Sequence, residues 1–191
     1  FISTRSGSSK IYVMDPDGTG AAEIATNAAP DSTLDWSPDG SKIVFDSFAH
    51  SGREIIVVNV DGSGETALTD DAHDDKEPAW SQDGSKIAFS SDREGDQTVF
   101  SMNADGSSIT AMNDTVGGST PEWSPDGLKI AFSSDTSGNG EIYVVDVDGT
   151  DLTRLTDNTS TDKSPTWSPD SLKIAFTSDR NDSSLEQIFV M

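Results

Sequence analysis

Three aspartates occupy one position of a repeated phrase, five residues before a tryptophan. They are Asp31, Asp75 and Asp162, and Gly118 holds the same position in the fourth copy. Carboxylates brought together from separate repeats repel one another, so they favour a cation or a basic group that neutralises them. We therefore predict that these aspartates form a binding site where the repeats meet, for a partner of basic character or a divalent cation such as Ca²⁺. The alternative is a hydrated acidic funnel.

A histidine lies within an acidic loop just before the second tryptophan. His73 stands in Asp70-Asp-Ala-His-Asp-Asp-Lys-Glu77, and an imidazole among carboxylates can ligate a divalent metal. We assign His73 to the same predicted site, with a solvated loop as the alternative. The other histidine, His50, stands in Phe48-Ala-His-Ser-Gly52 and has no visible partner.

A second acidic set lies in the turns. Asp146, Asp148 and Asp151 belong to Asp146-Val-Asp-Gly-Thr-Asp151, which is similar to the opening of a calcium loop but lacks the later ligands and the bidentate Glu. Asp-Gly is also an ordinary hairpin turn. We expect at most weak cation binding at these three aspartates, and no cofactor.

Catalytic motifs are missing from the sequence. It has no Cys and no Gly-x-Ser-x-Gly phrase, which removes the common cysteine and serine nucleophiles. A pair of carboxylates acting as a glycosidase is an alternative on residue type alone. We predict a protein that is not an enzyme.

Composition narrows the partners further. The 191 residues carry 34 acidic and 12 basic side chains, a net charge of −22, so nucleic acid is a poor partner because phosphate contacts need clustered Lys and Arg. No apolar run reaches the ~18 residues of a membrane span. Phe1 falls inside a strand pattern, so we expect no leader peptide in this sequence, and the absence of Cys is compatible with an extracytoplasmic protein.

The elements that position these residues come from a repeat. Tryptophan recurs at intervals of 44, 43 and 44 residues, each time followed by a Ser-Pro-Asp-Gly-like turn and by Lys-Ile-Ala/Val-Phe. The tryptophans are Trp36, Trp80, Trp123 and Trp167. A period in the forties is typical of one four-stranded propeller blade. Because the four Trp share one context, we predict that they are structural wedges between blades.

Further strands follow in each repeat. Phrases such as Ile142-Tyr-Val-Val-Asp predict a third strand, and Asp-x-Asp-Gly turns lead to a short fourth strand. The pattern predicts 18 strands in an all-β propeller of four-stranded antiparallel blades, with five blades that are incomplete at both ends. A fragment of a six- or seven-bladed ring is the alternative. The repeat units are residues 1–26, 27–69, 70–112, 113–156 and 157–191 of a single domain, and open blade edges invite self-association.

The phrase Pro-x-Trp-Ser-Pro-Asp-Gly-x-Lys-Ile-Ala-Phe-x-Ser-Asp-Arg, followed by Ile-Tyr-Val-x-Asp and Leu-Thr, resembles the TolB-type (WD-like) propeller repeat over essentially the whole chain. Local departures are Leu34 in place of Pro, Gln82 in place of the turn Pro and Ser171 in place of the turn Gly. The α/β domain of TolB has no counterpart here.

The resemblance implies a binding scaffold in the periplasm or outside the cell. The predicted site residues would then lie on the face with irregular loops, at the mouth of the central channel, and would bind a basic protein or peptide. The alternative implied by the same family is an accessory propeller of a prolyl-oligopeptidase-like peptidase or of a carbohydrate-active enzyme.

Overall fold

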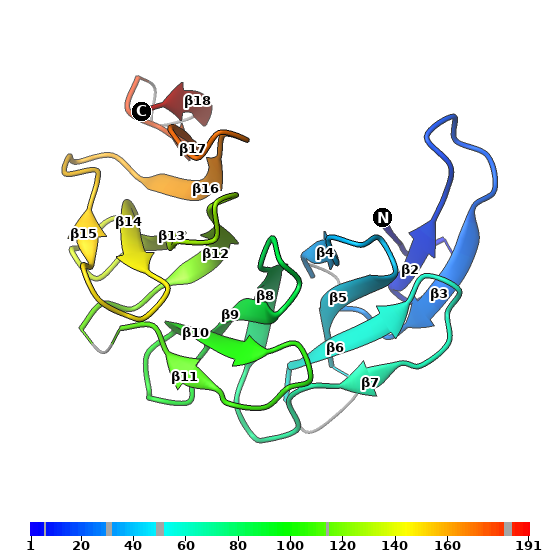
Figure 1. Cartoon of the computed structure of the whole chain (residues 1–191). Helices are drawn as coiled ribbons and strands as arrows, with labels where there is room; N and C mark the ends of the chain where they lie inside the picture. Colours follow the sequence, from blue (N-terminus) through cyan, green and yellow to red (C-terminus); the bar gives the residue numbers. More distant parts are fainter. Residues whose placement is uncertain (6, 30–31, 49–51, 114, 182–184) are drawn as a thin grey trace.

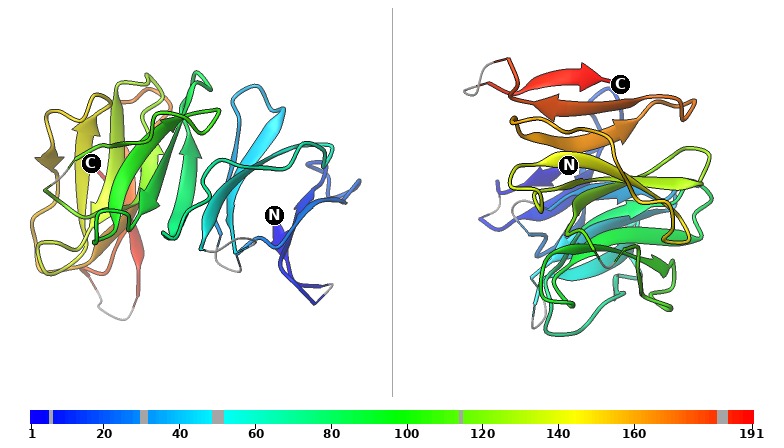
Figure 2. Two further views of the ribbon diagram at one scale, coloured as in Figure 1. Left: turned by 90° about the horizontal axis from the view of Figure 1, so that it is seen from below. Right: turned by 90° about the vertical axis from the view of Figure 1, so that its left-hand side faces the viewer.

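The computed structural model describes residues 1–5, 7–29, 32–48, 52–113, 115–181 and 185–191. These residues form 18 strands in five antiparallel sheets, which confirms the predicted propeller of five blades. The sheets follow one another radially along an open arc, with blades 1 and 5 at its two ends (Figure 1). Figure 2 shows the same succession of sheets from two other sides.

The strands of each blade follow chain order. Blade 1 contains β1 (Ile2–Ser3), β2 (Lys10–Val13) and β3 (Ala22–Thr26). Blade 2 contains β4 (Leu34–Trp36), β5 (Lys42–Ser47), β6 (Glu54–Asn59) and β7 (Thr66–Ala67), and blade 3 contains β8 (Asp75–Trp80), β9 (Lys86–Ser91), β10 (Thr98–Asn103) and β11 (Thr110–Ala111). Blade 4 contains β12 (Ser119–Trp123), β13 (Lys129–Ser134), β14 (Glu141–Asp146) and β15 (Thr153–Arg154), and blade 5 contains β16 (Asp162–Trp167), β17 (Ile174–Ser178) and β18 (Gln187–Val190).

The Ser-Pro-Asp-Gly phrase closes the hairpin between the first two strands of a blade. In blade 4 the amide of Gly127 donates to the carbonyl of Ser124 at 2.8 Å, and the carboxylate of Asp126 accepts the hydroxyl of Ser124 at 2.6 Å. Gly127 has a φ of 73°, a left-handed conformation that glycine adopts without steric cost. Ser171, which replaces this glycine in blade 5, adopts the same conformation with a φ of 59°.

The core lies between the blades. Side chains of a strand alternate between its two sides, so each blade has a front face, which packs on the next blade, and a back face, which packs on the preceding one. The front face of blade 2 holds Val44, Ile55 and Val57, and these meet the back face of blade 3 in one buried cluster. Equivalent clusters join the other neighbouring blades.

Three of the tryptophans pack between blades as predicted. Trp167 is half-buried against the cluster between blades 4 and 5, and its indole donates to the carbonyl of Glu122 at 3.2 Å. Trp80 and Trp123 are 8% and 7% exposed, and the indole of Trp123 donates to the carbonyl of Ala79 in the preceding blade at 3.1 Å. The wedge prediction is wrong for Trp36, which is 48% exposed. Blade 1 begins at its second strand in the part described, so no inner strand lies in front of Trp36 to cover it.

Candidate binding site in the central channel

The first strands of blades 2 to 5 line the centre of the propeller. These strands, β4, β8, β12 and β16, lie on the concave side of the arc (Figure 1) and pack against one another in order. They enclose a pocket of about 260 Å³. Every one of these strands contributes an apolar residue to its lining, which includes Leu34, Pro78, Ala79, Pro121 and Pro165. Its polar groups include three carboxylates, Asp35, Glu77 and Glu122.

A β-bulge shapes three of the four inner strands. The register of β8, β12 and β16 shifts at the residue pair that contains the proline, and the residue before each proline has a positive φ: 57° at Glu77, 52° at Thr120 and 53° at Ser164. A bulge inserts a residue that the partner strand does not match and re-aims the side chains beside it. The strand β4 has Leu34 in place of proline and pairs without a register shift.

Two of the pocket carboxylates bind the backbone of the next blade. Oδ2 of Asp35 accepts the amide of Trp80 at 2.6 Å, and Oε2 of Glu77 accepts the amide of Thr120 at 2.8 Å. Glu77 also accepts the hydroxyl of Ser90 at 3.0 Å. These contacts hold the two side chains in place, and a carboxylate has more acceptor sites than these bonds use.

The third carboxylate titrates near neutral pH. Burial first, and then the negative charge of Asp35, raise the pKa of Glu122 to about 7, against a hydrogen bond with Thr166 that lowers it. Burial also raises the pKa of Asp35, against hydrogen bonds from the backbone of Trp80 and Trp36. Perturbed carboxyl groups that face a pocket are typical of functional sites.

Asp75 and Asp162 lie elsewhere, at the starts of β8 and β16, and both are fully buried. Arg93 donates to both oxygens of Asp75 at 2.9 and 2.8 Å, and Arg180 donates to Asp162 at 2.7 Å. The premise that these aspartates present free carboxylates to a ligand is wrong, because a guanidinium of their own blade already neutralises each one. A ligand contact at either aspartate stays a prediction that this geometry does not test.

The sequence carried a signal for these ion pairs. Blade 4 lacks both partners, with Gly118 in place of the aspartate and Thr136 in place of the arginine, whereas the second repeat keeps Asp31 and has Ala49 at the arginine position. A Cβ at Gly118 would lie 2.6 Å from Phe132, and an aspartate cannot fit there. The arginines also stack on the aromatic pair of their own blade, with the guanidinium of Arg180 4.5 Å from the ring centre of Phe189.

Only one group of three potential metal ligands lies close together in the described part of the chain. Oxygens of Glu54, Asp71 and Asp75 lie within 4.8 Å of one another. Arg93 stands beside them, with Nη2 2.8 Å from Asp75 and 3.5 Å from Asp71. Burial raises the pKa of Glu54, and the hydroxyl of Thr69 opposes it. The guanidinium thus supplies the positive charge that this cluster needs.

The other predicted residues have separate surroundings. Asp31 and His50 lie outside the described residues. His73 is half-exposed, with Nδ1 3.3 Å from Oδ1 of Asp92. Asp146 pairs with Lys129, and Asp148 accepts the hydroxyl of Thr150 at 2.6 Å; cation binding at Asp146, Asp148 and Asp151 stays a prediction.

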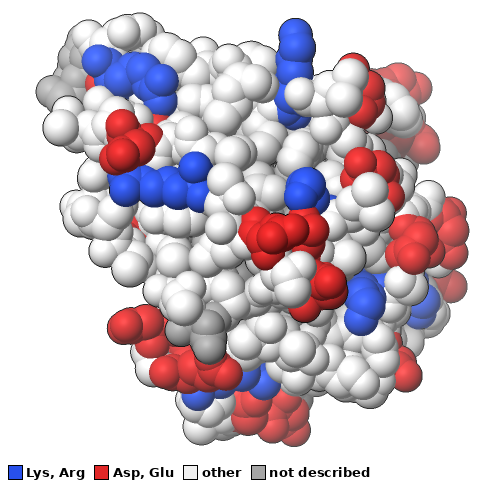
Figure 3. All heavy atoms as spheres, turned by 60° about the vertical axis from the view of Figure 1, so that its left-hand side comes forward, with Lys and Arg blue, Asp and Glu red and all other residues white. Residues whose placement is uncertain are grey.

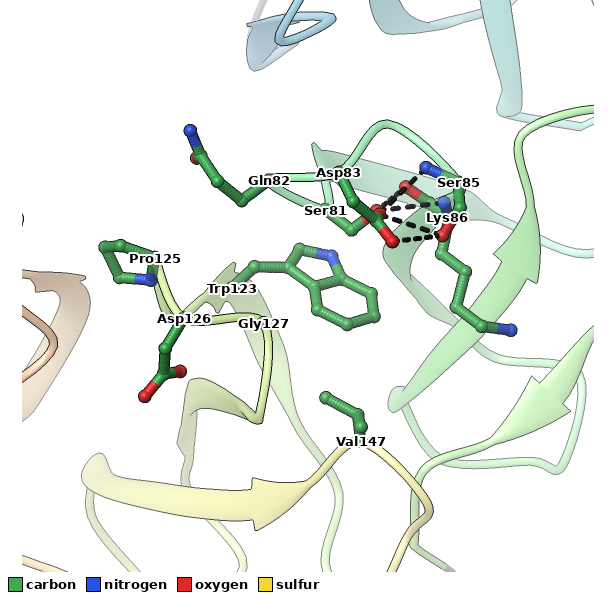
Figure 4. Close-up of a pocket in the computed structure, with 10 residues that line it drawn as sticks. All are labelled: Ser81, Gln82, Asp83, Ser85, Lys86, Trp123, Pro125, Asp126, Gly127 and Val147. Carbon is green, nitrogen blue, oxygen red and sulfur yellow. Dashed lines mark hydrogen bonds between the residues drawn. The ribbon is translucent and has the colours of Figure 1, made fainter.

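Further pockets lie between neighbouring blades beside the Ser-Pro-Asp-Gly-like hairpin turns. One of about 400 Å³ lies between blades 3 and 4, where the indole of Trp123 stands between the turn that begins at Ser81 and the side chain of Val147 (Figure 4). Asp83 points to its own turn, accepting the hydroxyls of Ser81 and Ser85 at 2.8 Å. These hydrogen bonds stabilise the hairpin turn itself. We therefore interpret this pocket as a gap between two packed blades.

Charges of both signs occur together on the surface. On the face in Figure 3, acidic side chains form separate groups with lysines or arginines beside them. A pocket of about 320 Å³ near the start of the inner strands is lined by Lys76 and Lys163 as well as by Asp135. The channel is therefore acidic inside, at Asp35, Glu77 and Glu122, and mixed at its mouth.

Comparison with protein-family models identifies the family of the chain. The family model described as the TolB beta propeller domain matches residues 35–120 and 113–191. The chain therefore belongs to the TolB beta-propeller domain family. No curated protein matches it.

Solved structures agree on the fold. A putative TolB from Agrobacterium tumefaciens superimposes with a TM-score of 0.78 at 22% identity, covering 95% of this chain and 76% of that one. An oligogalacturonate lyase in complex with manganese gives 0.75 at 17%, covering 96% and 54%, and a puromycin hydrolase S511A mutant gives 0.73 at 15%, covering 96% and 31%. The chain thus spans about half of the lyase and a third of the hydrolase.

Proposed function

We propose that this protein is a non-enzymatic binding module whose central pocket takes a lysine or arginine side chain from a segment of another protein. The observation that supports it most is the convergence of Asp35, Glu77 and Glu122 from three separate blades on one pocket. Family membership is compatible with a protein-binding role, and the residues named here go beyond what the family implies.

The pocket has two kinds of lining that suit such a side chain. Leu34 and the three prolines offer apolar surface, against which the methylene stem of Lys or Arg packs while its charged head reaches polar groups. The carboxylates of Asp35 and Glu77 would accept hydrogen bonds from that head with their remaining acceptor sites. Charged hydrogen bonds of this kind are about twice as strong as neutral ones.

Binding depends on pH through Glu122. Its pKa is raised to about 7 in the free protein, first by burial, so a fraction of the molecules carry a neutral carboxyl at neutral pH. A bound cation favours the ionised form. The affinity of the pocket for the cationic side chain therefore increases as the pH rises through about 7, and it decreases as the pH is lowered through the same range.

The experiment is a titration of a fluorescein-labelled pentalysine peptide against two triple variants. Asp35→Asn/Glu77→Gln/Glu122→Gln removes three charges from the pocket, and Asp17→Asn/Asp61→Asn/Asp105→Asn removes three from exposed turns. We expect the pocket variant to lose at least about tenfold in affinity, equivalent to about 1.4 kcal/mol, and the turn variant to lose less than about threefold. Equal losses would mean that only the overall charge binds the peptide.

The location and the lack of catalysis are part of the same proposal. We place the protein outside the cytoplasm on its likeness to TolB. No helix in the described part of the chain could cross a membrane.

The second candidate is an accessory propeller of a peptidase or of a carbohydrate-active enzyme, which the likeness to a hydrolase and a lyase favours. Turnover of a peptide or an oligogalacturonate by the purified chain would overturn the non-enzymatic assignment.

A further inference from the structure

A second pocket at the inner strands has a positively charged lining. Its volume is about 320 Å³, and its charged lining residues are Lys76, Lys163 and Asp135. Two ammonium groups and one carboxylate leave it with one net positive charge, in a molecule whose net charge is −22. The two lysines occupy the same position of β8 and β16, one residue after the buried aspartate of each strand. We call this site the lysine pocket.

The two ammonium groups are available to a ligand. Lys76 takes part in no ion pair in the part of the chain that the structure describes. Lys163 pairs with Glu186 at 2.6 Å, but these side chains are 46% and 53% exposed, and an exposed ion pair contributes little to stability. A carboxylate of a ligand can therefore replace Glu186 at small cost.

The rest of the lining offers polar groups and no further charge. Ser119, Ser133 and Ser134 contribute hydroxyl groups. Gln97 also lines the pocket, and its Nε2 is buried without a hydrogen-bond partner in the described structure; a buried donor of this kind needs an acceptor. Gly118 stands where blades 3 and 5 have a buried aspartate, so the wall carries no carboxylate there. This lining suits a group with one negative charge.

The lysine pocket adjoins the central pocket along three inner strands. Lys76, Ser119 and Lys163 line the lysine pocket, and the residue that follows each of them, which is the bulge residue with a positive φ, lines the central pocket. An extended chain advances about 3.3 Å per residue. Two neighbouring side chains of one bound segment therefore reach both pockets.

We propose that the bound segment carries an acidic residue next to its basic residue, with the basic side chain in the central pocket and the carboxylate in the lysine pocket. This charge pair rests on the proposed function and adds a second recognised group to it. The effect of the acidic residue has a sign that bulk charge does not give. A net charge of −22 repels any carboxylate, whereas the lysine pocket attracts one at contact distance.

Fluorescence anisotropy of three rhodamine-labelled peptides with the whole chain, at about 0.15 M salt, tests the charge pair. The peptides are Gly-Glu-Lys-Glu-Gly, Gly-Gln-Lys-Gln-Gly and Gly-Glu-norleucine-Glu-Gly, and a glutamate on each side of the lysine allows either chain direction. Lys76→Gln/Lys163→Gln neutralises the lysine pocket. Lys86→Gln/Lys173→Gln is the control, because it removes two lysines that follow the hairpin turns of the same two blades. Circular dichroism checks that both variants are folded.

We expect the wild-type protein and the control variant to bind the glutamate peptide at least about fivefold more tightly than the glutamine peptide, since ammonium groups form strong hydrogen bonds with a carboxylate. In the lysine-pocket variant the order should reverse, because only the repulsion by the net charge remains. Wild-type protein that binds the glutamine peptide as tightly as the glutamate peptide, or more tightly, would overturn the charge pair. An equal loss of the preference in both variants would do the same.

The norleucine peptide separates the charge pair from the proposed function. A loss of at least about tenfold in affinity on replacing lysine by norleucine supports a basic side chain in the central pocket. If that loss occurs without a preference for glutamate, the charge pair alone is refuted. Equal affinities of the norleucine and lysine peptides refute the proposed function, and the charge pair with it.

Discussion

Carboxylates of this chain divide by the partners that surround them. Those in the turns accept hydroxyl and amide hydrogen bonds, and the pKa of Asp39 falls to about 2, chiefly through the hydroxyl of Ser37. Asp75 and Asp162, at the starts of inner strands, each pair with an arginine of their own blade. Glu122 and Asp35 have raised pKa values, because burial outweighs their hydrogen bonds, and at Glu122 the negative charge of Asp35 adds to the effect of burial. This difference makes the central pocket the candidate site.

Removing Arg93 should test how much the buried ion pair of Arg93 with Asp75 stabilises the fold. Arg93→Ala leaves the buried carboxylate of Asp75 without its counter-charge, and breaking a buried ion pair costs about 3–5 kcal/mol. The matched control is Lys129→Ala, which removes a pair whose lysine is 44% exposed and should cost less than about 1 kcal/mol. Urea unfolding gives both values. Equal, small losses would show that Asp75 does not need its partner.

At the scale of elements, the strand order and the turns could be predicted from the sequence. The turn phrases mark each chain reversal, and the register of the hairpins follows from them. The pocket residues could not be found by the same reasoning. Alternation predicts which side of a strand a residue faces, but the bulge before Trp80, Trp123 and Trp167 shifts that parity inside β8, β12 and β16.

A weaker signal for the pocket was nevertheless present. The positions just before each tryptophan vary, with Asp35 and Glu122 in two blades and Ala79 and Thr166 in the others. Variation inside a constant phrase is compatible with a role other than packing. The burial of Asp75 and Asp162 depended on their arginine partners, which lie 18 residues away in sequence and meet them only through the pairing of two strands.

The tryptophans should differ in their effect on stability. Trp123→Ala empties a buried site between two blades and should cost about 3–5 kcal/mol in the free energy of unfolding. Trp36→Ala should cost less than about half as much, because its side chain is 48% exposed and little packing is lost. Thermal unfolding of both variants measures the difference. A loss at Trp36 as large as that at Trp123 would contradict the exposure of Trp36.

At the scale of the whole molecule, the arc of blades brings the inner strands of four blades around one pocket, so a single bound side chain would contact residues far apart in sequence. The net charge of −22 would draw a basic segment toward the protein at low salt and speed its association.

The most direct test of the central claim follows the titration of Glu122 by carbon NMR of its side-chain carboxyl, with and without saturating pentalysine. The pKa is about 7 in the free protein, raised by burial first, and a cation bound beside the carboxyl lowers it. We predict a fall of at least about one unit on binding, while the carboxyl of Asp148, held by Thr150 in an exposed turn, does not change. An unchanged titration of Glu122, or equal shifts at both carboxyls, would contradict binding in the central pocket.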